Sequence, residues 1–297
     1  MLLSCGEALI DMIEEAGQFV PAVGGAALNT AVAMARLGVS SGMVAGLSSD
    51  FFGDQIREHL EESRVDFTYS PVSDRTTTLA FAKLIDGQAR YRFYDEGSAG
   101  RMVSEFTQMP EHTEALLFGG ISLCGDPSGA AYEALADREA GKRFILFDPN
   151  IRPAFITDES GYRDRLWRMI RRADMVKMSD EDMAWICPEA ADPSAQIAQV
   201  TSQMTGVLII TKGGDGAQAI LPDQSTVHVK AESVKIVDTI GAGDTVNAGL
   251  LVSLREQGAF HDLTSDTVRT ALEFAMKAAA ITVSRRGANP PWQSELN

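Results

Sequence analysis

Residues 237–251 read VDTIGAGDTVNAGLL and place glycines and two aspartates at the start of an apolar helical segment. Glycine lets backbone N–H groups approach a ligand, and a helix N-terminus favours negative charge. Asp244 is itself an anion, so its position behind Gly241, Ala242 and Gly243 suggests a chemical role. The turn would stabilise charge on a phosphoryl group while Asp244 accepts the proton of an alcohol. The structural alternative is a helix start with Asp244 as its cap.

Two common glycine-rich motifs do not fit this stretch. A Walker A loop needs GxxxxGK[ST], and the sequence contains no such string. A dinucleotide fingerprint needs GxGxxG early in the fold, but GAGDTV has Val246 at the third glycine position and lies near the C-terminus. Neither nucleotide-binding motif therefore explains the glycines.

Composition narrows the class of protein. The 297 residues, 45% of them hydrophobic, suit one large α/β domain with a small appendage. The net charge of −15 argues against nucleic acid as the main partner, because phosphate backbones select basic faces. No apolar run approaches the ~18 residues of a membrane span. The three cysteines lie far apart without CxxC spacing, which is typical of a cytoplasmic protein.

Strand and helix patterns alternate along most of the chain, which predicts βαβ units and a mostly parallel central sheet. The pattern changes between about 66 and 96, where TTTLAFAKLIDGQARYRFYDEG alternates and contains Asp86-Gly87, a hairpin signal. We expect a small antiparallel sheet here, joined by residues 11–23. The sequence shows no linker, so residues 1–297 are predicted to form one domain with this sheet as a lid.

Three further segments carry polar groups suited to a ligand. VGGAALNTAVAMARLG has the pair Gly24-Gly25, with Asn29 at a helix start. FDPNIRP places Arg152 after a buried strand, at the edge where α/β sheets bind ligands. ITKGGDG forms a glycine-rich turn after another strand.

With these motifs in this order, the sequence resembles the ribokinase-like (PfkB-type) carbohydrate kinases along nearly its whole length. GGAALNTAVAMARLG and DTIGAGDTVNAGLL correspond to the two characteristic motifs of that family. CGEALIDM, YRFYDEGSAGRM, LFGGISL and FDPNIRP are most similar to bacterial fructokinases. The resemblance implies a three-layer α/β/α domain, ATP and Mg²⁺ as nucleotide and metal, and a sugar as acceptor.

The resemblance also assigns roles to individual residues. It makes Asp244 the catalytic base and the N–H groups of Gly241, Ala242 and Gly243 the anion hole. The remaining positions are the sugar-binding Asp11, Gly24, Gly25 and Asn29, the phosphate-binding Arg152, the nucleotide-binding Thr211, Gly213 and Gly216, and Asn289 on the adenine side.

Two positions depart from the family pattern. The N-x-x-E motif that organises Mg²⁺ through water appears as Ser179 to Asp182, and the adjacent Glu181 is an alternative to Asp182. The monovalent-cation loop retains Asp238 and the Ile240 carbonyl, but RRGANPPWQ is shorter than its counterpart in ribokinase. The sequence therefore leaves activation by K⁺ open.

The function predicted is transfer of the ATP γ-phosphoryl group to a sugar hydroxyl, with fructose as substrate and fructose 6-phosphate as product. The alternatives are 2-keto-3-deoxygluconate, ribose or a nucleoside as acceptor, and a catalytically silent regulator. An acid sugar would call for an arginine such as Arg90, Arg92 or Arg101. In the lid, Phe93 should face the sugar and Tyr94 the opposite side, where a second subunit would cover it and form a homodimer.

Overall fold

The central sheet runs through the core of the protein. The computed structural model describes residues 1–15, 17–85 and 88–296. The strands lie in the order β14-β13-β12-β11-β10-β9-β1-β4. They are β1 Leu2–Cys5, β4 Ser41–Val44, β9 Ala115–Gly119, β10 Phe144–Asp148, β11 Met175–Ser179, β12 Val207–Thr211, β13 Ala217–Ile220 and β14 Thr226–Val229. Pairs from β4 to β12 are parallel and the last two pairs are antiparallel, which confirms the mostly parallel sheet.

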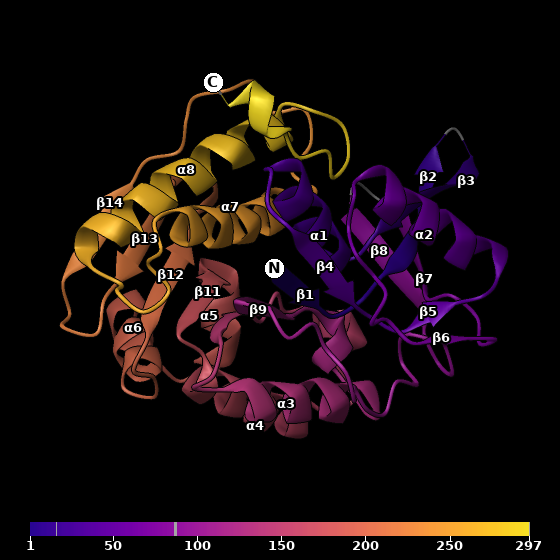
Figure 1. Ribbon diagram of the computed structural model, residues 1–297, viewed down its shortest axis with the longest axis horizontal. Helices are drawn as coiled ribbons and strands as arrows, with labels where there is room; N and C mark the ends of the chain where they lie inside the picture. The colour runs from indigo at the N-terminus through magenta and orange to yellow at the C-terminus, as the bar shows by residue number, and fades with distance from the viewer. Residues whose placement is uncertain (16, 86–87, 297) are drawn as a thin grey trace.

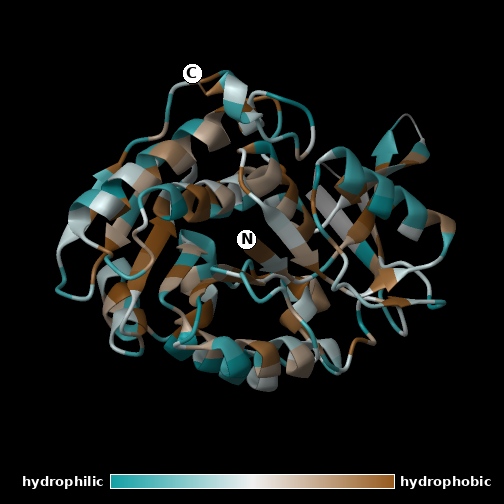
Figure 2. Cartoon of the chain, viewed as in Figure 1, coloured by the Kyte–Doolittle hydropathy of each residue, from teal (hydrophilic) through white to brown (hydrophobic). Residues whose placement is uncertain are grey.

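Helices cover both faces of this sheet (Figure 1). The helices packed on it are α1 Ala26–Arg36, α3 Ser128–Glu139, α4 Glu159–Arg172, α5 Asp180–Ile186, α6 Pro193–Thr201, α7 Ala242–Glu256 and α8 Ser265–Val283. Leu2 packs with α1, α7 and α8, whereas the next residue, Leu3, packs with α3 and α4 on the other face. The strands are therefore buried on both sides, as their unbroken apolar runs predict, and Figure 2 shows hydrophobic residues along them.

A second sheet of four strands lies beside the β4 end of the domain (Figure 1). Its order is β3-β2-β7-β8, with β2 Leu9–Glu15, β3 Gln18–Gly24, β7 Leu79–Ile85 and β8 Gln88–Tyr94. Helix α2, Phe51–Glu62, contacts β2 and β3. The small sheet expected from residues 11–23 and 66–96 is confirmed.

Details of the small sheet differ from the expectation. Residues 66–78 contribute only the short β6 Val72–Ser73, which pairs with β5 Leu47–Ser48. β2 and β7 pair in parallel, while the two hairpins are antiparallel. Hairpin signals specify pairing within a hairpin, and contacts between hairpins depend on long-range packing. The predicted Asp86-Gly87 turn lies outside the described residues.

Helix α5 is short and was not expected from the sequence, where its seven residues lack a clear apolar period. It begins directly after β11 and therefore lies at the carboxyl edge of the sheet. None of the helices in the described part of the chain combines the length and apolar character needed to cross a membrane.

Candidate active site

The glycine-rich turn forms the N-terminus of α7. Gly241 has φ of 76°, in the left-handed region, and a Cβ there would lie 2.8 Å from the Cβ of Ala288. Among the described residues, the N–H groups of Gly241 and Gly243 have no hydrogen-bond acceptor, and the N–H of Ala242 donates to the Thr239 carbonyl at 3.3 Å. The turn therefore offers backbone donors at the positive end of a helix dipole.

Asp244 lies in the first turn of α7 and is 8% exposed. Its Oδ2 accepts a hydrogen bond of 2.9 Å from Asn29 Nδ2, which joins the N-terminal and C-terminal motifs. Burial raises the pKa of Asp244 to about 7, although the Asn29 hydrogen bond and the Lys177 charge act in the opposite direction. A carboxyl group with a pKa near neutrality suits a general base.

Two adjacent glycines precede α1 and leave room for carboxylate and carbonyl groups. A Cβ on Gly24 would lie 2.2 Å from Oδ2 of Asp11. Gly25 has φ of 112°, and a Cβ there would lie 2.6 Å from the Glu7 carbonyl oxygen. Burial raises the pKa of Asp11 to about 6. Only glycine fits at positions 24 and 25, because any Cβ would overlap the Asp11 carboxylate or the Glu7 carbonyl oxygen.

The small sheet brings Asp11 and Phe93 to the same face. Asp11 is opposite Ala80, and Ala80 is opposite Phe93, so all three side chains point to one side. The Phe93 ring packs on Phe155 of the large domain, with 3.4 Å between ring centroids. Tyr94 points the other way and packs on Phe81. The opposite orientations expected for Phe93 and Tyr94 are confirmed. The strand alternation also predicts Tyr91 on the Phe93 face, but the Tyr91 side chain lies outside the described part.

A cavity of about 810 Å³ opens along the carboxyl ends of β11 and β12 and the start of α7. It brings together most of the predicted phosphate- and nucleotide-binding positions: Arg152, Ser179, Asp182, Thr211, Gly213, Gly216, Ala242 and Gly243. Arg152 lines the cavity and donates from Nη1 to the Ile151 carbonyl at 3.0 Å. It makes no ion pair within the described chain, so its positive charge remains available to a phosphate. This is the ligand edge expected of an α/β sheet.

The segment that departs from N-x-x-E forms a helix cap. Ser179 Oγ accepts from the Asp182 N–H, and Asp182 Oδ2 accepts from the Ser179 N–H, which is a capping box on α5. Asp182 Oδ1 accepts from the Ile151 N–H at 2.8 Å, and the side chain is buried. Glu181 also lines the cavity but is exposed. Asp182 thus has a structural role here besides any role in holding a metal.

The lining of this cavity does not include the other predicted positions, which are Asp11, Gly24, Gly25, Asn29, Phe93, Asp238, Ile240, Gly241, Asp244 and Asn289. Asp244 and Gly241 flank the lining residues Ala242 and Gly243 in sequence. Asp238 accepts hydrogen bonds from the Ile240 and Gly287 N–H groups, so its carboxylate joins two loops. Ile240 is exposed. Asn289 accepts a hydrogen bond of 2.8 Å from Arg36, and its assignment to adenine stays a prediction.

Sequence reasoning missed several residues of the site. Lys177 lines the cavity from the middle of β11, and a charged residue within an apolar strand was the available signal. Residues 231–234 and 236 line it from a segment without regular structure, and Met276, Ala279, Ala280 and Val283 line it from α8. These apolar residues gave no signal, because their spacing is that of any packed helix.

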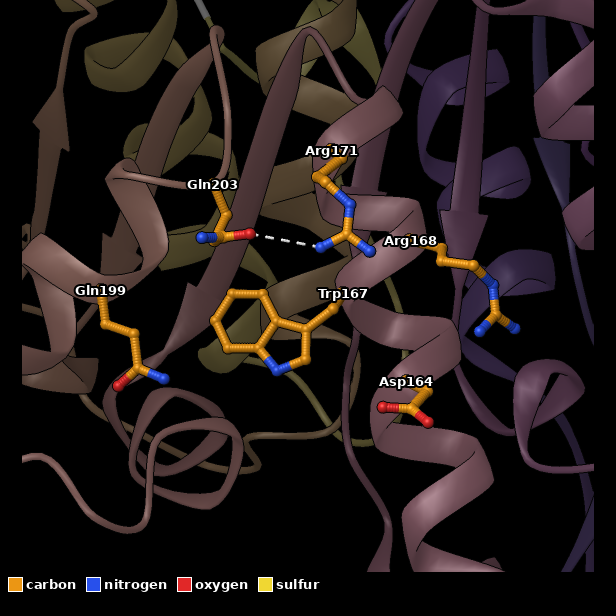
Figure 3. A pocket seen from close by; sticks show the side chains of 6 residues that line it. All are labelled: Asp164, Trp167, Arg168, Arg171, Gln199 and Gln203. Carbon is orange, nitrogen blue, oxygen red and sulfur yellow. Dashed lines mark hydrogen bonds between the residues drawn. The ribbon is translucent and has the colours of Figure 1, made fainter.

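A second hollow lies between α4 and α6 on the outer face of the domain (Figure 3). Trp167 stands at its centre, and Arg171 donates to Gln203 at 3.3 Å. Arg168 pairs with Glu133. None of the predicted site residues lines this hollow, so the cavity beside α7 is the candidate active site.

Comparisons with known proteins show the family of the chain. Residues 2–295 match the model of the pfkB family carbohydrate kinases. A fructokinase of Rhizobium leguminosarum bv. trifolii is 45% identical over 86% of this chain and 80% of its own length. A fructokinase structure with bound ATP, from Xylella fastidiosa, has a TM-score of 0.90 at 27% identity and covers 99% of this chain and 96% of its own. The structure of an aminoimidazole riboside kinase from Salmonella enterica, complexed with aminoimidazole riboside and an ATP analog, is also similar. Its TM-score is 0.87 at 26% identity, and the match covers 100% of this chain and 98% of that kinase.

Proposed function

Since the chain belongs to the pfkB family of carbohydrate kinases, we propose that its acceptor is fructose and its product fructose 6-phosphate. Phosphorylation of a sugar by ATP is its activity. One observation carries the proposed mechanism: the buried carboxylate of Asp244 contacts Asn29 at the start of α7, beside the large cavity. The identity of 45% to a fructokinase supports fructose as the acceptor.

In the proposed mechanism Asp244 is the general base. It accepts the proton of the sugar hydroxyl as the hydroxyl oxygen attacks the γ-phosphorus of ATP in line with the leaving ADP oxygen. The N–H groups of Gly241, Ala242 and Gly243 stabilise the charge on the transferred group, with that of Ala242 shared with the Thr239 carbonyl at 3.3 Å. Burial keeps water from the carboxylate, which strengthens each of these interactions.

Sugar and ATP approach Asp244 from two sides. Asp11, Asn29 and the backbone at Gly24 and Gly25 would hold the sugar hydroxyls. Thr211, Gly213 and Gly216 would lie along the nucleotide in the large cavity, with Arg152 and Ser179 toward its phosphates. The shared face of Asp11 and Phe93 supports the proposal that the small sheet closes over the sugar as a lid.

The cavity has the oxygen donors that suit Mg²⁺. Asp182 and Glu181 both line it, and Mg²⁺ is held by one or two carboxylates together with substrate phosphates. Bound Mg²⁺ would neutralise phosphate charge, with Asp182 orienting its water ligands and Glu181 as the alternative. Asp238 and the Ile240 carbonyl remain the proposed site for K⁺.

Exposed aromatic residues on the face of the small sheet opposite Asp11 support a homodimer. Other residues of this face pack on α1 and α2. Phe81 packs edge-on against Phe19 and Tyr94, and Phe19 and Tyr94 are 41% and 58% exposed. Exposed aromatic clusters of this kind are often covered by another protein. We propose that the lid of a second copy covers it.

Of the alternative acceptors, an acid sugar has less support than a nucleoside. Arg92 lies opposite Phe81 and so points away from the Asp11 face, and Arg101 is engaged with Asp95 and the Asp126 carbonyl, so neither favours an acid sugar. The Arg90 side chain lies outside the described part. Similarity to the aminoimidazole riboside kinase favours a nucleoside-like acceptor as the second candidate.

A ranking of kcat/KM separates these acceptors. Fructose, ribose, 2-keto-3-deoxygluconate and aminoimidazole riboside would be compared with Mg-ATP in an ADP-release assay. We expect fructose to rank first. A higher kcat/KM for the riboside would refute fructose as the acceptor, and absence of turnover with every sugar would favour the silent regulator.

A further inference from the structure

A lysine is buried beside the phosphate turn. Lys177 stands in β11 between the apolar residues Val176 and Met178 and is 5% exposed. Burial of an ammonium group is unfavourable unless the charge is compensated. Lys177 therefore needs a partner inside the protein.

Asp148 at the end of β10 is that partner. Its Oδ2 accepts 2.7 Å hydrogen bonds from both Lys177 Nζ and Asn247 Nδ2. These two donors fix the carboxylate, and the carboxylate fixes the ammonium. Burial opposes the charge of Lys177, but Asp148 and, more weakly, Asp182 and Asp244 outweigh it and raise its pKa. Lys177 thus stays protonated.

The ammonium has unused donors on the side of the cavity. An ammonium group carries three N–H donors, and within the described chain Lys177 uses one of them, on Asp148. Lys177 also lines the large cavity together with Gly243. A Cβ on Gly243 would lie 3.0 Å from Lys177 Nζ. The ammonium therefore occupies the space beside the turn, and glycine at 243 leaves room for it.

We infer that Lys177 is a catalytic residue that donates hydrogen bonds to the oxygens of the phosphoryl group during its transfer. The inference rests on the proposed reaction. In that step the bond from the γ-phosphorus to the ADP oxygen breaks, the bond to the sugar oxygen forms, and the hydroxyl proton passes to Asp244. Lys177 keeps its proton throughout. A fixed positive charge in a site with little water stabilises the negative charge on the phosphoryl oxygens.

The alternative role for Lys177 is neutralisation of Asp148, and three variants separate the two. Lys177→Met removes the ammonium, Asp148→Asn removes its partner, and the double variant removes the pair without leaving a buried charge. We expect Lys177→Met to lower kcat by about 10²–10³, as loss of an oxyanion donor does. ADP lacks the transferred group, so its Kd should stay within about threefold of wild type.

The double variant gives the decisive comparison. If Lys177 is catalytic, kcat of Lys177→Met/Asp148→Asn stays at or below that of Lys177→Met. Recovery to within about tenfold of wild type would show that Lys177 only balances Asp148, because removal of both charges would then be tolerated. Wild-type kcat in Lys177→Met would also overturn the inference. If Lys177→Met does not fold, the double variant is compared with wild type directly.

These measurements use the sugar that wild-type protein phosphorylates fastest. A failure of fructose as acceptor therefore refutes the proposed substrate without affecting the Lys177 comparison. A failure of the Lys177 inference likewise leaves the substrate ranking intact.

Discussion

Replacement of Asp244 by Asn should lower turnover and raise stability together. The amide keeps the shape of the side chain and can still accept from Asn29, but it no longer takes up a proton. We expect kcat to fall by about 10²–10⁴, the range for positioned acid–base groups. Ground-state binding of ATP should change little, because Asp244 acts on the acceptor hydroxyl.

The stability effect follows from the pKa of Asp244. Burial raises this pKa from 3.8 to about 7, so ionisation of the carboxyl group destabilises the fold. The penalty is absent below the unfolded-state pKa, grows as pH rises from about 4 to about 7, and is complete above that. Its size is on the order of 4 kcal/mol at pH 8 and about 2 kcal/mol at pH 5.5. Asp244→Asn removes this penalty.

Urea unfolding of both proteins at pH 5.5 and pH 8 measures the difference directly. Contributions from titrating groups that do not interact with Asp244 cancel between variant and wild type; Lys177, Asp148 and Glu7 interact with it. We expect Asp244→Asn to be the more stable protein, by a margin about 2 kcal/mol larger at pH 8. Asp262→Asn, at an exposed position, is the matched control and should show no such trend. A margin that is constant with pH, or that favours wild type at pH 8, would refute the burial argument.

Three further predictions concern pH, metal and lid. The kcat/KM for sugar should rise with pH through about 7, because Asp244 must be ionised to accept a proton; a flat profile from pH 6 to 8 would contradict its role as base. Asp182→Ala should raise the Mg²⁺ concentration for half-maximal rate; if Glu181→Ala does so and Asp182→Ala does not, Glu181 is the residue that organises the metal. Phe93→Ala should raise the KM for sugar more than that for ATP, and an unchanged sugar KM would place Phe93 away from the sugar. Size-exclusion chromatography of the wild-type protein with light scattering should give a dimer, and a monomer at micromolar concentration would exclude the lid interface.

The sequence predicted the parts of the structure that depend on local pattern. Strand β10 has the apolar sequence FILFD and is buried on both faces, as that sequence predicts. The glycine at position 241 predicts a positive φ before α7, and the structure has it there. The contact between Asn29 and Asp244 joins residues 215 positions apart, and only the family resemblance brought them to one site.

Other parts of the site follow from packing and were not predictable locally. The parallel pairing of β2 with β7 joins two hairpins through tertiary contacts. Ser179 and Asp182 form a capping box that starts α5, and the resemblance to N-x-x-E gave no indication of this helix. The role of Asp182 toward Mg²⁺ stays a prediction. The position of Lys177 in the cavity lining could not be predicted, because assignment of a residue to a strand does not indicate which cavity its side chain lines.

Phosphorus NMR of the product formed from fructose and Mg-ATP is the most direct measurement of the proposed reaction. We predict one new phosphomonoester, fructose 6-phosphate, formed in equal amount to ADP and reduced by at least about 10² in initial rate with Asp244→Asn. Phosphate on another fructose hydroxyl, or an undiminished rate with Asp244→Asn, would contradict the assignment of Asp244 and the orientation of the sugar.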